Sequence, residues 1–180
     1  MSKKVKVAVM PEQGKIGIRE FPFPDHLEDG AMIVRPIMSG ICGTDKHAFR
    51  GESVQYAGTE REIFGPYPVI PGHENVAVVV EITPKARREM EFYGEALSEG
   101  DRVVISPDIV CGYCYQCRHG FHYTGCENIE SYGHMKCDDP PHLFGGWAEY
   151  MYIKPGSHVC KVPAEISDEI AVEGSFRSSK

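Results

Sequence analysis

Short runs of aliphatic and β-branched residues, separated by turns rich in glycine and proline, dominate the first half of the chain. Residues 4–10 and 15–21 alternate or enrich β-branched residues, and the Pro-Glu-Gln-Gly sequence at 11–14 marks a turn between them. Residues 31–38 form a third apolar run, which Gly40 closes. The pattern predicts three strands in this part of the chain.

Three further runs extend the β pattern. Residues 75–83 contain a dense series of valines, which is typical of a strand buried on both faces. Residues 102–106 predict a short strand after a Gly-Asp turn, and the alternation at 147–154 predicts a late one. Several short strands bounded by glycine and proline indicate a mainly β fold, a barrel or a sandwich with excursions.

Three segments depart from this pattern. Residues 84–98 are charged and partly helical in propensity, so we expect a surface excursion there. Residues 51–71 predict a long loop rich in Gly, Pro and Tyr, and long loops in compact domains often serve function. Residues 167–172 begin like a capped helix, with Ser167 or Asp168 as N-cap, and after about one turn give way to a polar tail. That ending is typical of a truncation.

Composition and charge narrow the class of protein. The chain has 180 residues, of which 42% are hydrophobic and 25% charged, as in a soluble globular domain. A net charge of −7 without a basic run argues against binding to nucleic acid. No apolar stretch approaches the roughly 20 residues of a membrane span, and the first ten residues lack the apolar core of a secretory signal. We therefore expect a cytoplasmic protein without a membrane partner.

The cysteines are distributed unevenly. Four of the seven lie close together, at Cys111, Cys114, Cys117 and Cys126. Thiols stay reduced in the cytosol, and this spacing can place four thiolates around one zinc ion. A site with four protein ligands leaves no open position, so its role is structural. The scattered Cys137 and Cys160 are typical of free thiols.

An iron–sulfur cluster is the main alternative for this group, because its first three cysteines match the ferredoxin spacing. That motif requires its fourth cysteine after three more residues, followed by proline. The chain has Phe121 and His122 in this place, which excludes the match. The sequence therefore favours zinc.

A second group of chemically active residues lies upstream. The chain reads Gly-Ile-Cys-Gly-Thr-Asp-Lys-His at 40–47 and Pro-Gly-His-Glu at 71–74. A catalytic zinc takes about three protein ligands and keeps one position for substrate. Cys42 and His73 supply two candidate ligands, and Asp45 is a candidate acceptor for the second ring N–H of His73.

These segments resemble the zinc-dependent medium-chain alcohol dehydrogenases, which include threonine, sorbitol and glucose dehydrogenases. Further matches are Gly-Asp-Arg-Val at 100–103, the cysteine segment, Gly-Gly-Trp-Ala-Glu-Tyr at 145–150, and Lys-Val-Pro-Ala-Glu-Ile-Ser-Asp-Glu at 161–169. The resemblance covers almost the whole chain, in the family's order. It implies a GroES-like β-barrel domain over residues 1–166, with short helices and a zinc lobe at 108–130. Residues 167–180 would begin the helix that leads to a missing Rossmann domain.

The resemblance also implies roles for individual residues. Cys42 and His73 become ligands of a catalytic zinc, with Glu74 beside the metal as a neighbour or an exchangeable ligand. Thr44 would accept the proton of the zinc-bound alcohol and pass it towards His47 and solvent. The substrate would be a small alcohol or polyol, and NAD or NADP the hydride acceptor. Family members are usually dimers or tetramers, so a homo-oligomer is possible.

Three features depart from the family pattern. Eight residues separate Cys117 from Cys126, where the family usually has seven, which predicts a bulge at 118–125. No two glycines lie two positions apart, so the Gly-x-Gly-x-x-Gly fingerprint of dinucleotide binding is absent from these 180 residues. The family's remaining zinc ligand is a Cys or Glu near the start of the dinucleotide-binding half. Glu173 lies near this place but lacks the Glu-Pro-Leu surroundings of the polyol and threonine relatives.

Other functions stay open at this stage. The chain could be a non-catalytic zinc-binding module, or an inactive half of a dehydrogenase. It could also be a redox switch that releases zinc when its thiolates oxidise.

Overall fold

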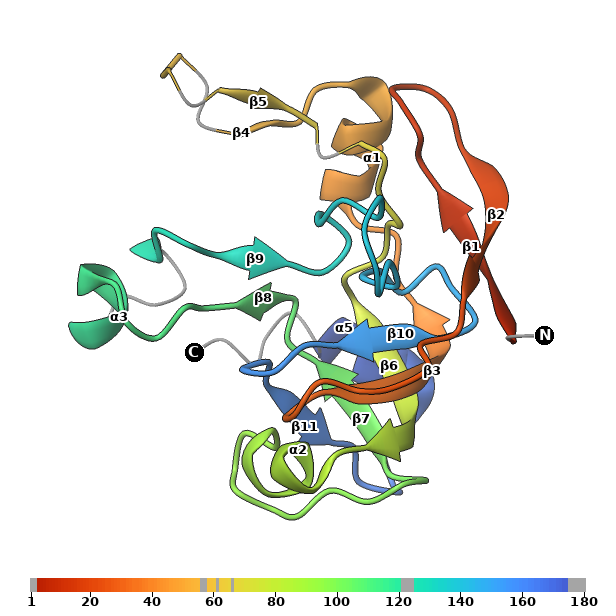
Figure 1. Ribbon diagram of the computed structural model, residues 1–180, viewed down its shortest axis with the longest axis vertical. Coiled ribbons are helices and arrows are strands. Elements are labelled where there is room, and N and C mark those ends of the chain that lie inside the picture. The colour runs from red at the N-terminus through yellow and green to blue at the C-terminus, as the bar shows by residue number, and fades with distance from the viewer. Residues whose placement is uncertain (1–2, 56–57, 61, 66, 121–124, 175–180) are drawn as a thin grey trace.

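An antiparallel sheet of five strands forms the centre of the molecule (Figure 1). The structure is a computed structural model that describes residues 3–55, 58–60, 62–65, 67–120 and 125–174. In sheet order the strands are β10 (Met151–Ile153), β3 (Met32–Ser39), β6 (Asn75–Ile82), β7 (Arg102–Ile105) and β11 (Val159–Lys161).

A two-stranded ribbon, β1 (Lys4–Val9) and β2 (Gly17–Pro22), lies beside this sheet. Val5, Val7 and Val9 are buried, because β1 turns every second side chain inward. Two small antiparallel pairs project from the body in Figure 1, β4 (Val54–Gln55) with β5 (Ile63–Phe64) and β8 (Asp108–Ile109) with β9 (Glu130–Ser131).

The central strands are buried on both faces. Along β3, Met32 and Val34 enter one hydrophobic cluster, while Ile33 between them enters a second cluster with the valines of β1. Tyr152 of β10 joins this second cluster, and its neighbours in the strand join the first. This alternation is the two-residue period of a β-strand, and it ties the ribbon to the sheet.

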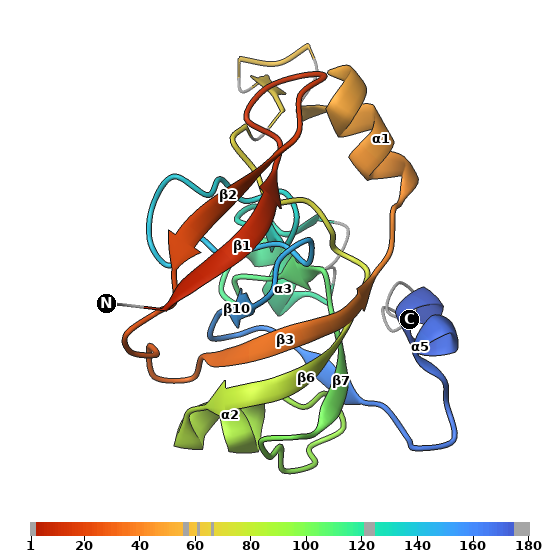
Figure 2. The same ribbon diagram turned by 90° about the vertical axis from the view of Figure 1, so that its right-hand side faces the viewer.

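The helices are short and lie at the edges. They are α1 (Gly43–Arg50), α2 (Pro84–Glu89), α3 (Tyr115–Arg118) and α5 (Asp168–Gly174). Figure 2 shows α5 beside the end of β3 and β6, away from α2. There Ala171 and Val172 pack against Val76. No helix in the described ranges is long and apolar enough to cross a membrane.

The mainly β prediction is confirmed, with differences in several segments. The strand expected at 147–154 is confined to β10, because the backbone of Trp147 and Glu149 hydrogen-bonds to β1 instead. The valine-rich strand β6 is buried at its start, but Val80 and Glu81 are exposed. The segment at 84–98 is more than an excursion, since α2 and the turn after it place Ala86, Met90 and Leu97 in the core.

The helix expected near the end is present and longer than predicted. It runs over seven residues as α5, and Ser167 O accepts the backbone N–H of Ala171 at 2.9 Å. This geometry makes Ser167 the N-cap. Arg102 of β7 fastens the start of the helix through its guanidinium, which lies 3.0 Å from Asp168 Oδ1.

Candidate metal centres

Cys42 begins the first candidate centre as the N-cap of α1. Its Sγ accepts the backbone N–H of Thr44 at 3.4 Å, and the Asp45 carboxylate accepts the backbone N–H of Cys42 at 2.9 Å. This reciprocal arrangement is a capping box, which satisfies two helix N–H groups that have no partner inside the helix. The capping box therefore fixes the positions of the thiol and of the Asp45 carboxylate.

His73 reaches the same place from the loop that precedes β6. Gly72 before it has a φ of +90°, and a Cβ on this residue would collide with the Trp147 ring and the Ser39 hydroxyl. His73 Nε2 lies 3.3 Å from Thr44 Oγ1, which in turn lies 2.8 Å from Cys42 Sγ. Ligand atoms of Cys42, Asp45 and His73 all lie within 4.8 Å of one another.

The protonation of His73 suits a metal ligand. Burial is the largest effect on this side chain and lowers its pKa from the ordinary 6.5, although the Asp45 carboxylate acts in the opposite direction. His73 is therefore neutral near pH 7, the form that donates a lone pair to a metal. Its Nδ1 is buried and has no hydrogen-bond partner among the residues that the structure describes.

Asp45 stands near that nitrogen but does not bond to it. The distance from Asp45 Oδ1 to His73 Nδ1 is 3.7 Å, too long for a hydrogen bond, and with a neutral imidazole the contact is not an ion pair. The expected Asp45–His73 hydrogen bond is thus not formed, because both Asp45 oxygens accept backbone N–H groups, from Cys42 and Gly72. The buried Asp45 side chain is therefore itself a member of the group with Cys42 and His73. It is not an outer partner that only orients the His73 ring.

The other predicted residues lie around this group. The Glu74 side chain packs against Gly40 and is not a member of the group. His47 faces outward from α1, with its Nδ1 2.7 Å from Glu52 Oε2. Glu173 is exposed at the end of α5 and belongs to neither group of candidate metal ligands found among the described residues. Thr44 alone of these residues bridges the thiol and the imidazole.

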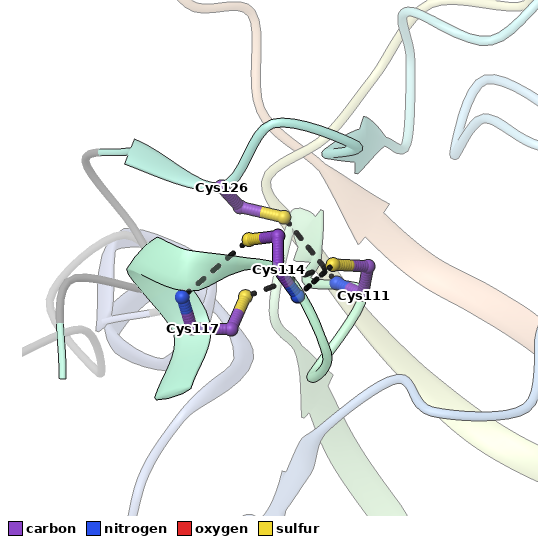
Figure 3. A group of neighbouring side chains, drawn as sticks. All are labelled: Cys111, Cys114, Cys117 and Cys126. Atoms are coloured by element: carbon purple, nitrogen blue, oxygen red, sulfur yellow. Dashed lines mark hydrogen bonds between the residues drawn. The ribbon is translucent and has the colours of Figure 1, made fainter. Parts of the chain in front are cut away.

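The second candidate centre is the cysteine cluster, which projects from the body next to α3 (Figure 3). The ligand sulfurs of Cys111, Cys114, Cys117 and Cys126 all lie within 4.8 Å of one another. Backbone N–H groups point at these sulfurs, among them those from Cys111 to Cys126, from Cys114 to Cys111 and from Cys117 to Cys114. Cys114 is also the N-cap of α3.

These hydrogen bonds favour the thiolate at Cys111 and Cys114, whereas desolvation raises the pKa of Cys117. Desolvation raises the pKa of Cys111, but N–H groups of Tyr113, Cys114 and Asn128 outweigh it and lower that pKa to about 6. Hydrogen bonds from the backbone of Cys117 and Glu127 lower the pKa of Cys114 as well. Four thiolates this close repel one another, so their full ionisation needs a cation at the centre. The donor set fits zinc.

Comparisons with known proteins settle the family. Residues 28–164 match the model of the alcohol dehydrogenase GroES-like domain. The chain belongs to the alcohol dehydrogenase family, as its GroES-like domain. A Mycobacterium tuberculosis protein described as a probable alcohol dehydrogenase is 32% identical over 93% of this chain and 42% of its own length.

Solved structures agree with this family. A Thermotoga maritima alcohol dehydrogenase superimposes with a TM-score of 0.82 and 30% identity, over 96% of this chain and 44% of that one. An Escherichia coli alcohol dehydrogenase complexed with NADH gives a TM-score of 0.69 and 26% identity, over 94% of this chain and 41% of that one. The chain thus spans about two fifths of the length of these relatives. The predicted family and the predicted GroES-like fold are confirmed.

Sequence reasoning missed two residues of the first centre in this alcohol dehydrogenase domain. Asn75 is fully buried, and its Nδ2 donates to the carbonyl of Gly72 at 3.1 Å, which holds the loop that carries His73. The ring of His134 lies 5.2 Å from that of His73, measured between centroids. His134 is 61 positions away in the sequence, so only the tertiary fold brings the two imidazoles together.

Proposed function

We propose that this chain is the zinc-binding catalytic domain of an alcohol or polyol dehydrogenase, with the nicotinamide cofactor bound by a further domain. The observation that carries the proposal is the group of Cys42, Asp45 and His73 beside the Thr44 hydroxyl. A soft thiolate, a neutral imidazole and a carboxylate form a donor set that zinc accepts readily.

In this proposal Cys42 and His73 hold the zinc, while Asp45 and Glu74 are the candidates for a further contact. Zinc bound there supplies a Lewis acid that lowers the energy of a developing alkoxide charge. The Thr44 hydroxyl lies between thiol and imidazole, where it can accept the proton of a substrate alcohol. His47 lies one turn further along α1 and is open to solvent, so it is suited to release that proton.

The cysteine lobe, residues 108–130, has a structural role in the proposal. Among the described residues of the lobe, its hydrophobic cluster contains the cysteines and the partly buried Val110 and Ile129. A lobe with so small a core depends on metal coordination for its shape. Cys111, Cys114, Cys117 and Cys126 therefore hold the second zinc.

The hydride acceptor in the proposal is NAD or NADP, which the nucleotide-bound E. coli relative supports. Residues 1–166 form the GroES-like domain, and residues 167–180, of which 175–180 lie outside the described residues, lead towards the cofactor domain. A cytoplasmic location and a homo-oligomeric state belong to the same proposal.

The test is reduction of NAD or NADP by the metal-loaded chain joined to the cofactor domain that the proposal requires, with a panel of simple alcohols and polyols as substrates. We expect turnover that Cys42→Ser abolishes and that Cys137→Ser, which replaces a thiol outside both centres, retains. Absence of turnover with both centres loaded would contradict the proposal and favour the alternative, a non-catalytic zinc-binding module.

A further inference from the structure

His134 lies next to the first candidate centre, and the proposed mechanism does not use it. It belongs to the turn after β9, and its ring is tilted by 44° against the ring of His73. It is half-buried, so part of its side chain is open to solvent beside the His73 ring.

The turn that carries His134 is held firmly. Tyr132 is fully buried, and its hydroxyl lies 2.7 Å from Ser157 Oγ and accepts the backbone N–H of Lys154 at 2.7 Å. The N–H of Gly133 donates to Phe144 O at 2.7 Å. A Cβ on Gly133 would stand 3.2 Å from the backbone of Gly72, so this turn packs directly on the loop that carries His73. His134 therefore has a fixed position beside the centre.

The hydrogen bond of His134 determines which nitrogen is free. Nδ1 lies 3.3 Å from the carbonyl oxygen of Tyr132, and a carbonyl can only accept, so Nδ1 carries the hydrogen. In the neutral imidazole Nε2 is then an acceptor. Within the described part of the chain no hydrogen bond is formed by this nitrogen. A hydroxyl group is the natural donor to it.

We propose that His134 determines substrate specificity, because its Nε2 accepts a hydrogen bond from a second hydroxyl next to the one that reacts. The inference rests on the proposed function, since it takes the Cys42–His73 centre as the place where the reacting group binds. Zinc stands about 2.0–2.1 Å from an imidazole nitrogen, so a substituent on the adjacent carbon of the substrate comes within reach of a neighbouring ring. Vicinal diols and polyols are thus preferred over simple alcohols.

The test compares two thiols of equal size on the cobalt-loaded chain. Both 2-mercaptoethanol and 1-propanethiol bind cobalt as thiolates, and only the first has a hydroxyl for His134. The cobalt absorption band that is lost in Cys42→Ser belongs to the Cys42–His73 centre. The change of this band as each thiol is added gives the affinity of that thiol. One net hydrogen bond predicts that 2-mercaptoethanol binds about threefold to tenfold more tightly.

Variants of His134 separate this role from a structural one. His134→Phe keeps a ring but loses the acceptor, so the preference for 2-mercaptoethanol disappears, and His134→Asn gives the same result if the Phe variant does not fold. His134→Gln keeps an acceptor and retains the preference. The control His26→Phe changes an exposed histidine elsewhere and leaves the preference intact.

The outcomes distinguish two failures. Equal affinities in the wild type, or a preference that persists in the Phe and Asn variants, would overturn the role of His134 and leave the metal centre standing. A chain with no cobalt band that depends on Cys42 would overturn the proposed function and the inference with it.

Discussion

Single residues hold the first centre in place through contacts between distant segments. Cys42 caps α1 with the same sulfur that faces His73, so helix capping and ligand placement depend on one atom. Trp147 Nε1 donates to the carbonyl of Gly40 at 3.3 Å and packs close to Gly72. The loops on either side of the centre are therefore fastened to the same aromatic side chain.

Gly72 gives the first prediction at this scale. We expect Gly72→Ala to lower the free energy of unfolding by about 2–4 kcal/mol, because a Cβ there meets both a positive φ and the Trp147 ring. The control is Gly14→Ala, whose φ of +72° is also positive but whose Cβ meets nothing within 4 Å. Gly14→Ala is expected to lower the free energy of unfolding by about 1 kcal/mol. Urea denaturation measures both, and equal losses would contradict the packing argument.

Cys137 gives a prediction on pH. Burial raises the pKa of this thiol to about 11 from the ordinary 9.0. The folded state therefore keeps the proton while the unfolded state loses it, so its contribution to stability is complete below pH 9 and is lost as pH rises towards 11. By pH 11 the wild type loses about 2 kcal/mol more than Cys137→Ala. Urea denaturation at a series of pH values measures the free energy of unfolding of both proteins. An equal fall with pH in the wild type and in Cys137→Ala would refute the prediction.

At the residue scale, the structure brings together the candidate ligands that local motifs indicated. The four lobe cysteines share one short spacing, whereas Cys42 and His73 belong to two separate short motifs, and the fold brings each set together. His134 and Asn75 carry no local signal, because their contacts to the His73 loop depend on how the turn after β9 and the start of β6 pack.

At the scale of elements, the strands that follow a clear apolar period were predictable and the short ones were not. β1, β2, β3, β6 and β7 lie within one or two residues of their predicted ranges. β8 and β9 have two residues each, too few for a period to emerge. β10 is shorter than its alternation indicates, since part of that segment pairs with β1 instead of extending the sheet.

Thr83 gives a prediction for α2. Its hydroxyl accepts the N–H of Gly30 at 3.0 Å and of Ala86 at 3.4 Å, and donates to Ala31 O at 2.9 Å. One side chain thus caps the helix and joins it to the start of β3. Thr83→Ala is expected to cost about 1–2 kcal/mol of unfolding free energy. Thr83→Ser, which keeps the hydroxyl, should recover most of this loss in thermal or urea unfolding, and a Ser variant as unstable as the Ala variant would disprove it.

At the scale of the whole molecule, the sheet and ribbon form a body from which the cysteine lobe and the β4–β5 hairpin project (Figure 1). The body has two extensive hydrophobic clusters, whereas the described residues of the lobe form a small one built mainly from its cysteines. Length and composition predicted a globular domain, the apolar pattern predicted its mainly β fold, and the family resemblance supplied the GroES-like architecture. The number of loaded metal centres follows from neither, because it depends on coordination as well as packing.

The most direct test of the account is the elemental metal content of the purified, reduced chain. We predict about two zinc ions per chain, with one lost in Cys42→Ser and the other lost in Cys114→Ser. Cys160→Ser, which replaces a thiol outside both centres, retains both ions. About one zinc per chain, kept by Cys42→Ser and lost by Cys114→Ser, would contradict the account and leave the cysteine lobe as the sole metal centre.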